Sequence, residues 1–363
     1  MSAEPLPTTD SFQEFLRQRR FPGLDGLRCL SILAVIAFHA FGHETSFRLV
    51  ARGDLGVELF FAISGFLITS LLLRERMKTG KIALVPFYVR RALRIFPLYF
   101  AVLGLYLVIV FAFERDVAAR AGFFQNLPAF ATYTSNWFVP RDEGNRVIFY
   151  FAWSLATEEQ FYLVWPVVLG LLPRTLLPCC FMAALLGTDV VAEAMIAAGT
   201  LNASSLPVRI VASIAAPICA GSLVAALMHV ERTFRWFHAV LGKPQSAAVL
   251  LLLVIALMLW PVAPDPTLAG LLALLVAACA LGSKHWLAPV LELPLVRYVG
   301  TISYGLYLLH MLALNVSKRL VPNASGPLLF LVTLALAMLI ASISYRFFEK
   351  PFLAWKERLS RSG

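Results

Sequence analysis

The stretch IFPLYFAVLGLYLVIVFAF, residues 95–113, contains no charged side chain. A helix that crosses a bilayer needs about 20 predominantly apolar residues, and this segment has that length and character. Its composition is typical of the chain, in which hydrophobic residues make up 60% of 363 residues and charged residues only 14%. Roughly a quarter of the residues of a soluble protein are charged. The composition therefore excludes an ordinary soluble enzyme, a disordered chain and a disulfide-rich secreted module.

Further apolar blocks of similar length occur on both sides of this stretch. They are continuous runs, whereas the strands of an outer-membrane barrel alternate apolar and polar residues. The pattern predicts an all-α fold, a polytopic transmembrane helix bundle of about ten spans. Asp189 and Glu193 interrupt one of the blocks. The predicted blocks cover residues 27–43, 54–73, 95–113, 148–172, 175–197, 210–228, 245–262, 267–283, 298–317 and 326–345.

The net charge of +10 is explained by membrane topology. With about ten spans and a cytoplasmic N-terminus, most Lys and Arg residues fall on inside segments, as the positive-inside rule requires. We therefore expect both termini in the cytoplasm, a multi-pass membrane protein, and no nucleic-acid partner. The expected organisation is a cytoplasmic segment at 1–24, the bundle at 25–350 and a cytoplasmic basic tail at 351–363. No cleavable signal peptide is visible.

The five cysteines show no pairing pattern. They are odd in number and lie in apolar or membrane-edge segments, so we expect buried small hydrophobic residues rather than a disulfide framework.

Arg28 and His39 are the polar residues of the first block. An ionisable group inside a bilayer costs at least ~2.5 kcal/mol and is a functional candidate for that reason. The two positions are eleven apart in the sequence, which places them on one helix face about 16 Å apart along the axis. Alternatively, Arg28 extends to the headgroups and His39 is a hydrogen-bonded histidine of the bundle. His39 and His43 have metal-ligand spacing, but no third ligand pattern accompanies them, so no metal is expected.

Glu58 lies near the outer end of the second block, at a depth similar to that expected for His39. A carboxylate there could orient an imidazole and stabilise its protonated form; a purely structural pair is the alternative. Ser64, followed by Gly65, is a weak candidate nucleophile because the sequence context of a nucleophile elbow is missing.

Arg90, Arg91 and Arg94 precede the third span. Arg91 and Arg94 share a helix face. They could anchor the span at the inner surface, or they could bind a polyanion, because arginine suits phosphate geometry.

The fourth block begins with WSLATEEQFYLVWP, residues 153–166. Glu158 and Glu159 point about 100° apart, so one of them would face the bundle interior. Trp153 and Tyr162 are the candidate substrate-binding residues of this stretch.

The ninth block contributes Tyr304 to the candidate substrate-binding set. Ser303, Tyr307 and His310 follow i, i+4, i+7 spacing and form a polar stripe, for which helix packing is as good an explanation as chemistry. The polar stretch at about 114–147, expected outside, is rich in aromatic residues that suit sugar stacking.

Five motifs in order resemble membrane acyltransferase family 3, which includes bacterial inner-membrane O-antigen and exopolysaccharide acetyltransferases. The resemblance covers the chain from about Phe21 to Pro351 and implies a multi-pass protein of the inner (plasma) membrane. The motifs are FPGLDGLRCLSILAVIAFHAF, GDLGVELFFAISGFLI, FYVRRALRIFPLYF, WSLATEEQFYLVWP and ISYGLYLLH.

The resemblance implies residue roles. The Arg-x10-His motif of the family falls on Arg28 and His39, with His39 catalytic. Its Arg-x-x-Arg motif, which serves the acyl donor, falls on Arg91 and Arg94, and its acidic residue after Trp-Ser-Leu on Glu158. Its C-terminal Glu-x-Pro falls on Glu349 and Pro351. Many relatives carry an added hydrolase-like domain, for which we expect no room here.

These observations predict an O-acyltransferase that uses acyl-CoA, most simply acetyl-CoA, as donor substrate and holds no permanently bound cofactor. Arg28, Arg90, Arg91 and Arg94 would bind the donor, and the acceptor would be a carbohydrate or a lipid-linked glycan. His39 would be the general base, oriented by Glu58 or Glu158; an acyl-histidine intermediate is the covalent variant. Two alternatives remain, a transporter or flippase of a sugar or lipid-linked intermediate, and an acyl-responsive scaffold without turnover.

Overall fold

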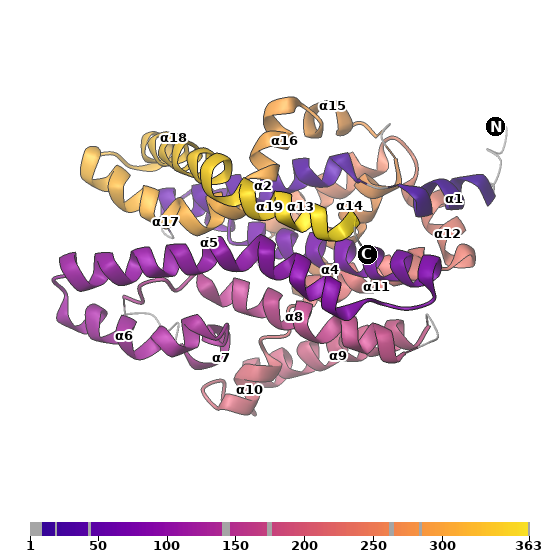
Figure 1. The fold of residues 1–363 in the computed structure, drawn as a ribbon, viewed down its shortest axis with the longest axis horizontal. Helices are drawn as coiled ribbons and strands as arrows, with labels where there is room; N and C mark the ends of the chain where they lie inside the picture. Colours follow the sequence, from indigo (N-terminus) through magenta and orange to yellow (C-terminus); the bar gives the residue numbers. More distant parts are fainter. Residues whose placement is uncertain are drawn as a thin grey trace. The chain divides into compact units, whose positions relative to one another are not determined.

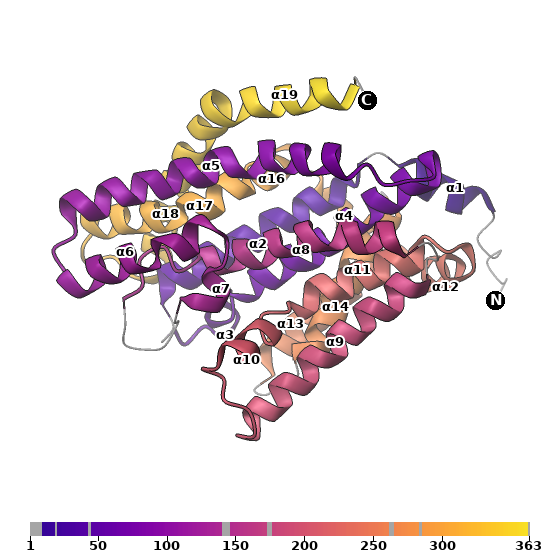
Figure 2. The same ribbon diagram turned by 60° about the horizontal axis from the view of Figure 1, so that its bottom comes forward.

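The computed structural model describes residues 9–18, 20–42, 45–139, 146–172, 176–260, 265–282 and 285–361. Every regular element in these ranges is a helix, which confirms the predicted all-α class. The chain forms two compact units, each built from three segments. Figures 1 and 2 show the helices of both units.

The first unit comprises Met1–Ile82, Leu169–Leu186 and Ala216–Ser342. Its helices are α1 (Thr9–Arg17), α2 (Pro22–Phe41), α3 (Arg48–Ala51), α4 (Leu55–Thr79), α11 (Ala216–Met228), α12 (Glu231–Leu241), α13 (Ser246–Leu259), α14 (Asp265–Leu281), α15 (Ala288–Leu291), α16 (Pro294–Thr301), α17 (Ser303–Leu320) and most of α18 (Gly326–Ser344).

The second unit comprises Ala83–Val168, Gly187–Ala215 and Ile343–Gly363. Its helices are α5 (Leu84–Phe113), α6 (Val117–Ala131), α7 (Ser135–Phe138), most of α8 (Ala152–Leu171), α10 (Leu206–Val211), a π-helical segment (Tyr345–Glu349) and α19 (Lys350–Arg361). Helix α9 (Leu176–Ala197) is divided between the two units.

Five of the described helices are long and apolar enough to cross a membrane: Gly23–Phe41, Leu55–Thr79, Leu84–Phe113, Leu177–Ala197 and Gly326–Trp355. Two bent pairs raise this number to as many as 7, namely α12 with α13, bent by 77°, and α16 with α17, bent by 75°. The chain is therefore a multi-pass helical membrane protein. The number of ten spans and the cytoplasmic position of the termini stay predictions.

Two predicted blocks are not single helices. The block at 210–228 is split, because α10 ends at Val211 and α11 begins at Ala216. The block at 298–317 is broken between α16 and α17. Hydropathy measures how apolar a window is but not whether its backbone stays straight, so neither break is visible in the composition.

Helix α4 is the centre of the first unit and packs against α2, α11 and α14. Its contact with α11 is a close backbone approach. A Cβ atom added to Gly65 would lie 2.1 Å from the carbonyl oxygen of Ile218, and one added to Gly221 would lie 2.3 Å from that of Ala62. Small residues allow such approaches between membrane helices, where dispersion contacts replace the hydrophobic effect.

Helix α5 is the longest element of the second unit and packs against α6 and α19. Figure 2 shows the yellow α19 running alongside the purple α5. The hydroxyl of Tyr99 in α5 donates to the carbonyl oxygen of Phe130 in α6 at 2.7 Å, and its ring stacks on Tyr133 at 4.3 Å. These contacts hold the residues after α5 against that helix.

The cysteines are all free, and Cys29, Cys179, Cys219 and Cys279 are buried as predicted. Cys180 is exposed, so the prediction was wrong there. Adjacent residues of a helix point about 100° apart, and the burial of Cys179 turns its neighbour outward.

We predict that Gly65→Ala lowers the free energy of unfolding by about 2 kcal/mol, because the new methyl group forces α4 and α11 apart. Gly270→Ala is the matched control, since no atom lies within 4 Å of a Cβ added there. Thermal unfolding in detergent measures both variants. Equal stability of the two would contradict the close packing of α4 on α11.

Candidate functional site

Helix α2 carries Arg28 and His39, as predicted. The Arg28 guanidinium forms an ion pair with Asp25 one turn earlier, at 3.0 Å, and both side chains remain partly exposed. His39 lies in the last turn of α2 and is half-buried. The two sequence candidates therefore lie near opposite ends of one helix, about 16 Å apart along its axis.

His310 of α17 lies beside His39. The two imidazole ring centroids are 5.2 Å apart and the ring planes are inclined by 30°. His310 is 1% exposed, and its Nδ1 lies 2.5 Å from the carbonyl oxygen of Tyr307. The ring centroid of Phe38 is 5.0 Å from that of His39. In the sequence, His310 belongs to a polar stripe with no assigned role, and that stripe was the signal that could have identified it.

Glu58 lies in the first turn of α4 and is half-buried. The preceding residues show how α4 crosses α2. Gly53 meets α2 at Ala34 and Phe38, and Gly56 meets it at Ser31 and Val35, so the two helices run antiparallel. Glu58 is then nearer to the level of Ser31 than to that of His39, and its role as a partner of His39 stays a prediction.

Tyr304 is a half-buried residue in the first turn of α17, directly after the break that follows α16. The backbone of α16 meets α2 at Asp25, where a Cβ atom added to Gly300 would lie 1.9 Å from the carbonyl oxygen. The break therefore lies near the Asp25 end of α2, and α17 continues from it toward His310.

In the second unit, Arg91 of α5 and Tyr162 of α8 form one cluster with Glu158. The Arg91 guanidinium carbon lies 4.8 Å from the centroid of the Tyr162 ring and 5.8 Å from that of Phe87, within the range of a cation–π contact. The Tyr162 hydroxyl donates to the Glu158 carboxylate one turn earlier. Arg91, a candidate from another helix, thus lies with Tyr162 and Glu158, which the sequence already places one turn apart.

Arg90 and Arg94 are half-buried in the same turns of α5. The charge of Arg94 acts on Glu349 of the π-helical segment, whose carboxylate accepts a hydrogen bond from Ser344 at 3.3 Å. Glu349 is the residue to which the resemblance assigned the C-terminal acidic position.

Trp153 is half-buried at the start of α8, and the next turns of α8 bind the segment that follows α6. Gln160 and Asn136 exchange two amide hydrogen bonds of 2.9 Å. Gln160 also donates to the carbonyl oxygen of Tyr133 at 2.8 Å. Tyr133 has a positive φ of 53°, a conformation that is unusual for a bulky residue. Sequence reasoning missed Gln160 and Asn136, because amides give no motif.

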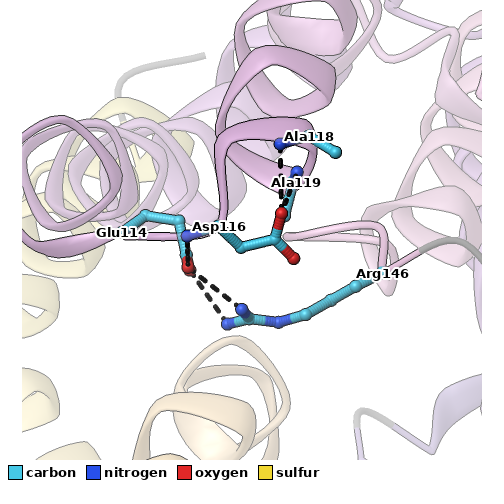
Figure 3. Close-up of polar contacts among 5 residues, drawn as sticks. All are labelled: Glu114, Asp116, Ala118, Ala119 and Arg146. Carbon is cyan, nitrogen blue, oxygen red and sulfur yellow. Dashed lines mark hydrogen bonds and ion pairs between the residues drawn. The ribbon is translucent and has the colours of Figure 1, made fainter.

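The stretch at 114–147 contains helices rather than a plain connection. Asp116 caps α6, since its Oδ1 accepts from the backbone N–H groups of Ala118 at 3.0 Å and Ala119 at 3.1 Å. Figure 3 shows this cap beside the ion pair between Arg146 and Glu114, which is 2.9 Å long. The cap and the pair order the two ends of the segment.

Two arginines outside the candidate site bind backbone carbonyl groups. Arg74 donates to the carbonyl oxygens of Phe15 and Gln18 of the N-terminal segment, and Arg76 donates to those of Leu169 and Leu172.

Between α14 and α15, burial lowers the pKa of His285. His43, the second residue of the weighed metal pair, lies outside the described residues.

Comparisons with known proteins identify the family of the chain. A family model described as an acyltransferase domain, of the acyltransferase 3 type, matches residues 21–346. The chain belongs to this acyltransferase family. The match covers α2 through α18 and therefore includes both sets of candidate residues.

Two relatives of this acyltransferase 3 chain come from Staphylococcus aureus. The protein named "Putative O-acetyltransferase SACOL0978" from strain COL is 28% identical over 370 residues, which cover 95% of this chain and 59% of the relative. The protein named "O-acetyltransferase OatA" from strain NCTC 8325 / PS 47 is 27% identical over 368 residues, which cover 92% of this chain and 57% of the relative. The chain thus spans about three fifths of the length of these relatives. No solved structure matches.

We predict that Gln160→Leu lowers the free energy of unfolding by about 2 kcal/mol, because Asn136 and the Tyr133 carbonyl lose buried partners. Gln125→Leu, on the exposed face of α6, is the matched control. Thermal unfolding in detergent compares the two. A Gln160 variant as stable as the control would contradict a role for these amides in holding the segment.

Proposed function

We propose that the chain is an integral membrane O-acyltransferase. It moves an acyl group, most simply acetyl, from cytoplasmic acyl-CoA to a hydroxyl of a cell-envelope or exported carbohydrate, and so belongs to the acyltransferases that transfer groups other than aminoacyl groups. The observation that carries the proposal is the pair of adjacent imidazoles, His39 and His310, with centroids 5.2 Å apart inside an apolar helix bundle of this family. The names of the relatives support O-acetyl transfer.

His39 acts as the general base of the reaction. The acceptor hydroxyl oxygen attacks the acyl carbonyl carbon, the new C–O bond forms and the C–S bond of the thioester breaks. The hydroxyl proton passes to His39 and from there to the sulfur of the departing thiolate. A positioned base of this kind contributes about 10²- to 10⁴-fold to the rate. Glu58 or Glu158 is the proposed carboxylate partner, and an acyl-histidine intermediate is the covalent form of the same step.

The arginines bind the donor. Coenzyme A carries phosphate groups, which arginine recognises with paired hydrogen bonds. Arg91 is held by the Tyr162 ring, and Tyr162 is held by Glu158, so its guanidinium loses little further freedom on binding. Arg28, Arg90 and Arg94 supply further positive charge. Trp153, Tyr162 and Tyr304 are the proposed contacts to substrate, since an aromatic face suits a sugar ring.

We predict that His39→Ala lowers acyl transfer at least about 100-fold, because the base is lost. The wild-type chain and the variant are reconstituted in vesicles with radiolabelled acetyl-CoA and a glycan extract from the native host, and label in the glycan is counted. Equal label with both chains would remove His39 from the reaction. No label with the wild type would count against acyl transfer itself.

We predict that Arg91→Ala combined with Arg94→Ala weakens coenzyme A binding about 10-fold or more, because two charge-assisted contacts are lost. Arg232→Ala combined with Arg235→Ala is the matched control, since these exposed arginines of α12 have the same spacing. Calorimetry with coenzyme A compares the two double variants. Equal affinity of the two double variants for coenzyme A would contradict donor binding by Arg91 and Arg94 and leave membrane anchoring as their role.

The two bent helix pairs favour one other candidate function, a transporter or flippase of a sugar or lipid-linked intermediate, because broken helices line the substrate sites of many transporters. The vesicle experiment separates the candidates. Movement of unmodified glycan across the bilayer without label would favour the transporter, whereas labelled glycan supports the acyltransferase.

A further inference from the structure

His310 is an ionisable side chain enclosed in the apolar interior of the first unit. It is 1% exposed and lies on α17 at a point where that helix passes α2. An ionisable group in such a place is costly and is a functional candidate by default. Its immediate neighbour is the imidazole of His39, the proposed base.

The surroundings of His310 determine which of its nitrogens carries the proton. Its Nδ1 lies 2.5 Å from the Tyr307 carbonyl oxygen, and a carbonyl oxygen can only accept a hydrogen bond. Nδ1 therefore carries the hydrogen and donates it. A neutral imidazole with a proton on Nδ1 has its lone pair on Nε2, so His310 provides a buried acceptor nitrogen beside His39.

Aromatic packing limits the rotation of the His310 ring. The Tyr307 ring centroid is 5.5 Å from that of His310, and the Phe60 ring of α4 packs edge-on against Tyr307 at 6.4 Å. A hydrogen bond to its own helix and a packed ring on one side hold the imidazole in one orientation. This arrangement suits a group that has to orient another.

We propose that His310, in place of a carboxylate partner, is a positioning residue for acyl transfer: during the reaction its Nε2 accepts from the N–H group of His39 and thereby directs the other nitrogen of His39 to the acceptor hydroxyl. The inference rests on the proposed function. His310 remains neutral throughout. The hydroxyl proton goes to His39 and leaves with the thiolate sulfur, while the C–O bond forms and the C–S bond breaks, so the role of His310 requires no additional reactant.

Two substitutions distinguish the roles of the two ring nitrogens of His310. In His310→Gln the side-chain amide reaches the place of Nε2, whereas in His310→Asn it takes the place of Nδ1 and keeps only the bond to Tyr307. A purely structural histidine needs Nδ1, and a positioning histidine needs Nε2. The order of activity of the two variants therefore distinguishes the roles.

His229 is the matched control. It is 6% exposed, and its Nδ1 lies 2.7 Å from the carbonyl oxygen of Ala225, one turn earlier. Its ring packs against Phe15 at 5.3 Å. It has the burial and the backbone bond of His310 but lies outside the proposed reaction, so His229→Gln reports what loss of such a bond does to the fold alone.

The experiment measures kcat and KM for acetyl-CoA with the full chain in vesicles, together with the thermal unfolding of each variant. We expect His310→Gln to keep kcat within about 10-fold of the wild type and His310→Asn to lose about 100-fold, with KM changed less than about twofold in both. His229→Gln should keep kcat. If His310→Asn is unstable, His310→Phe replaces it, since it keeps a ring against Tyr307 and lacks both nitrogens, and we expect the same loss of kcat.

The proposal would be overturned if His310→Asn were at least as active as His310→Gln. A full kcat in His310→Phe would overturn it as well. A loss of kcat in His229→Gln as large as that in His310→Asn would also overturn the proposal, because the loss would then come from a change in the fold. Failure of the proposed function looks different: the wild type transfers no label, or His39→Ala transfers as much as the wild type.

Discussion

The structure depends on one constraint, that polar groups in an apolar environment must find their partners within the protein. Helices satisfy the backbone, and the polar side chains then bond to carbonyl oxygens that the helices leave accessible. Ser31 donates to Leu27 at 3.0 Å and Ser222 to Ile218 at 2.8 Å. His310 binds Tyr307 in the same way. Polar residues thereby enter the bundle without disrupting it.

The same constraint explains what the basic residues do. Most of them would be accounted for by the positive-inside rule, but Arg74 and Arg76 also bind backbone carbonyl groups of distant segments. Arg91 differs, because its guanidinium lies near the aromatic rings of Phe87 and Tyr162 and its charge acts on Glu159. Aromatic faces and a nearby carboxylate both stabilise a guanidinium in an apolar environment.

Close contacts between helices bring residues that are distant in the sequence together. Glycines bring α4 against α11 and α16 against α2, and α17 passes α2 so that two imidazoles become neighbours. Rigid support of this kind is what the positioning of one side chain by another requires. In the second unit, the amides of the buried Asn136 and the half-buried Gln160 hold the segment that follows α6.

The sequence alone determined the helical class, the membrane setting, the shared face of Arg28 and His39, and the grouping of Tyr162 with Glu158. All of these follow from hydropathy and from the 3.6-residue repeat within one helix. The breaks before α11 and α17 could not be predicted, because apolar composition does not report backbone continuity.

Only the tertiary structure decided which residues of different helices meet. His310 lies beside His39, Arg91 lies over Tyr162, and Gly56 meets Ser31. The physical reason is that a contact between helices depends on their crossing, register and rotation. Packing of small and large side chains along the whole length of the helices sets those quantities. The residue pattern of a single helix does not determine them.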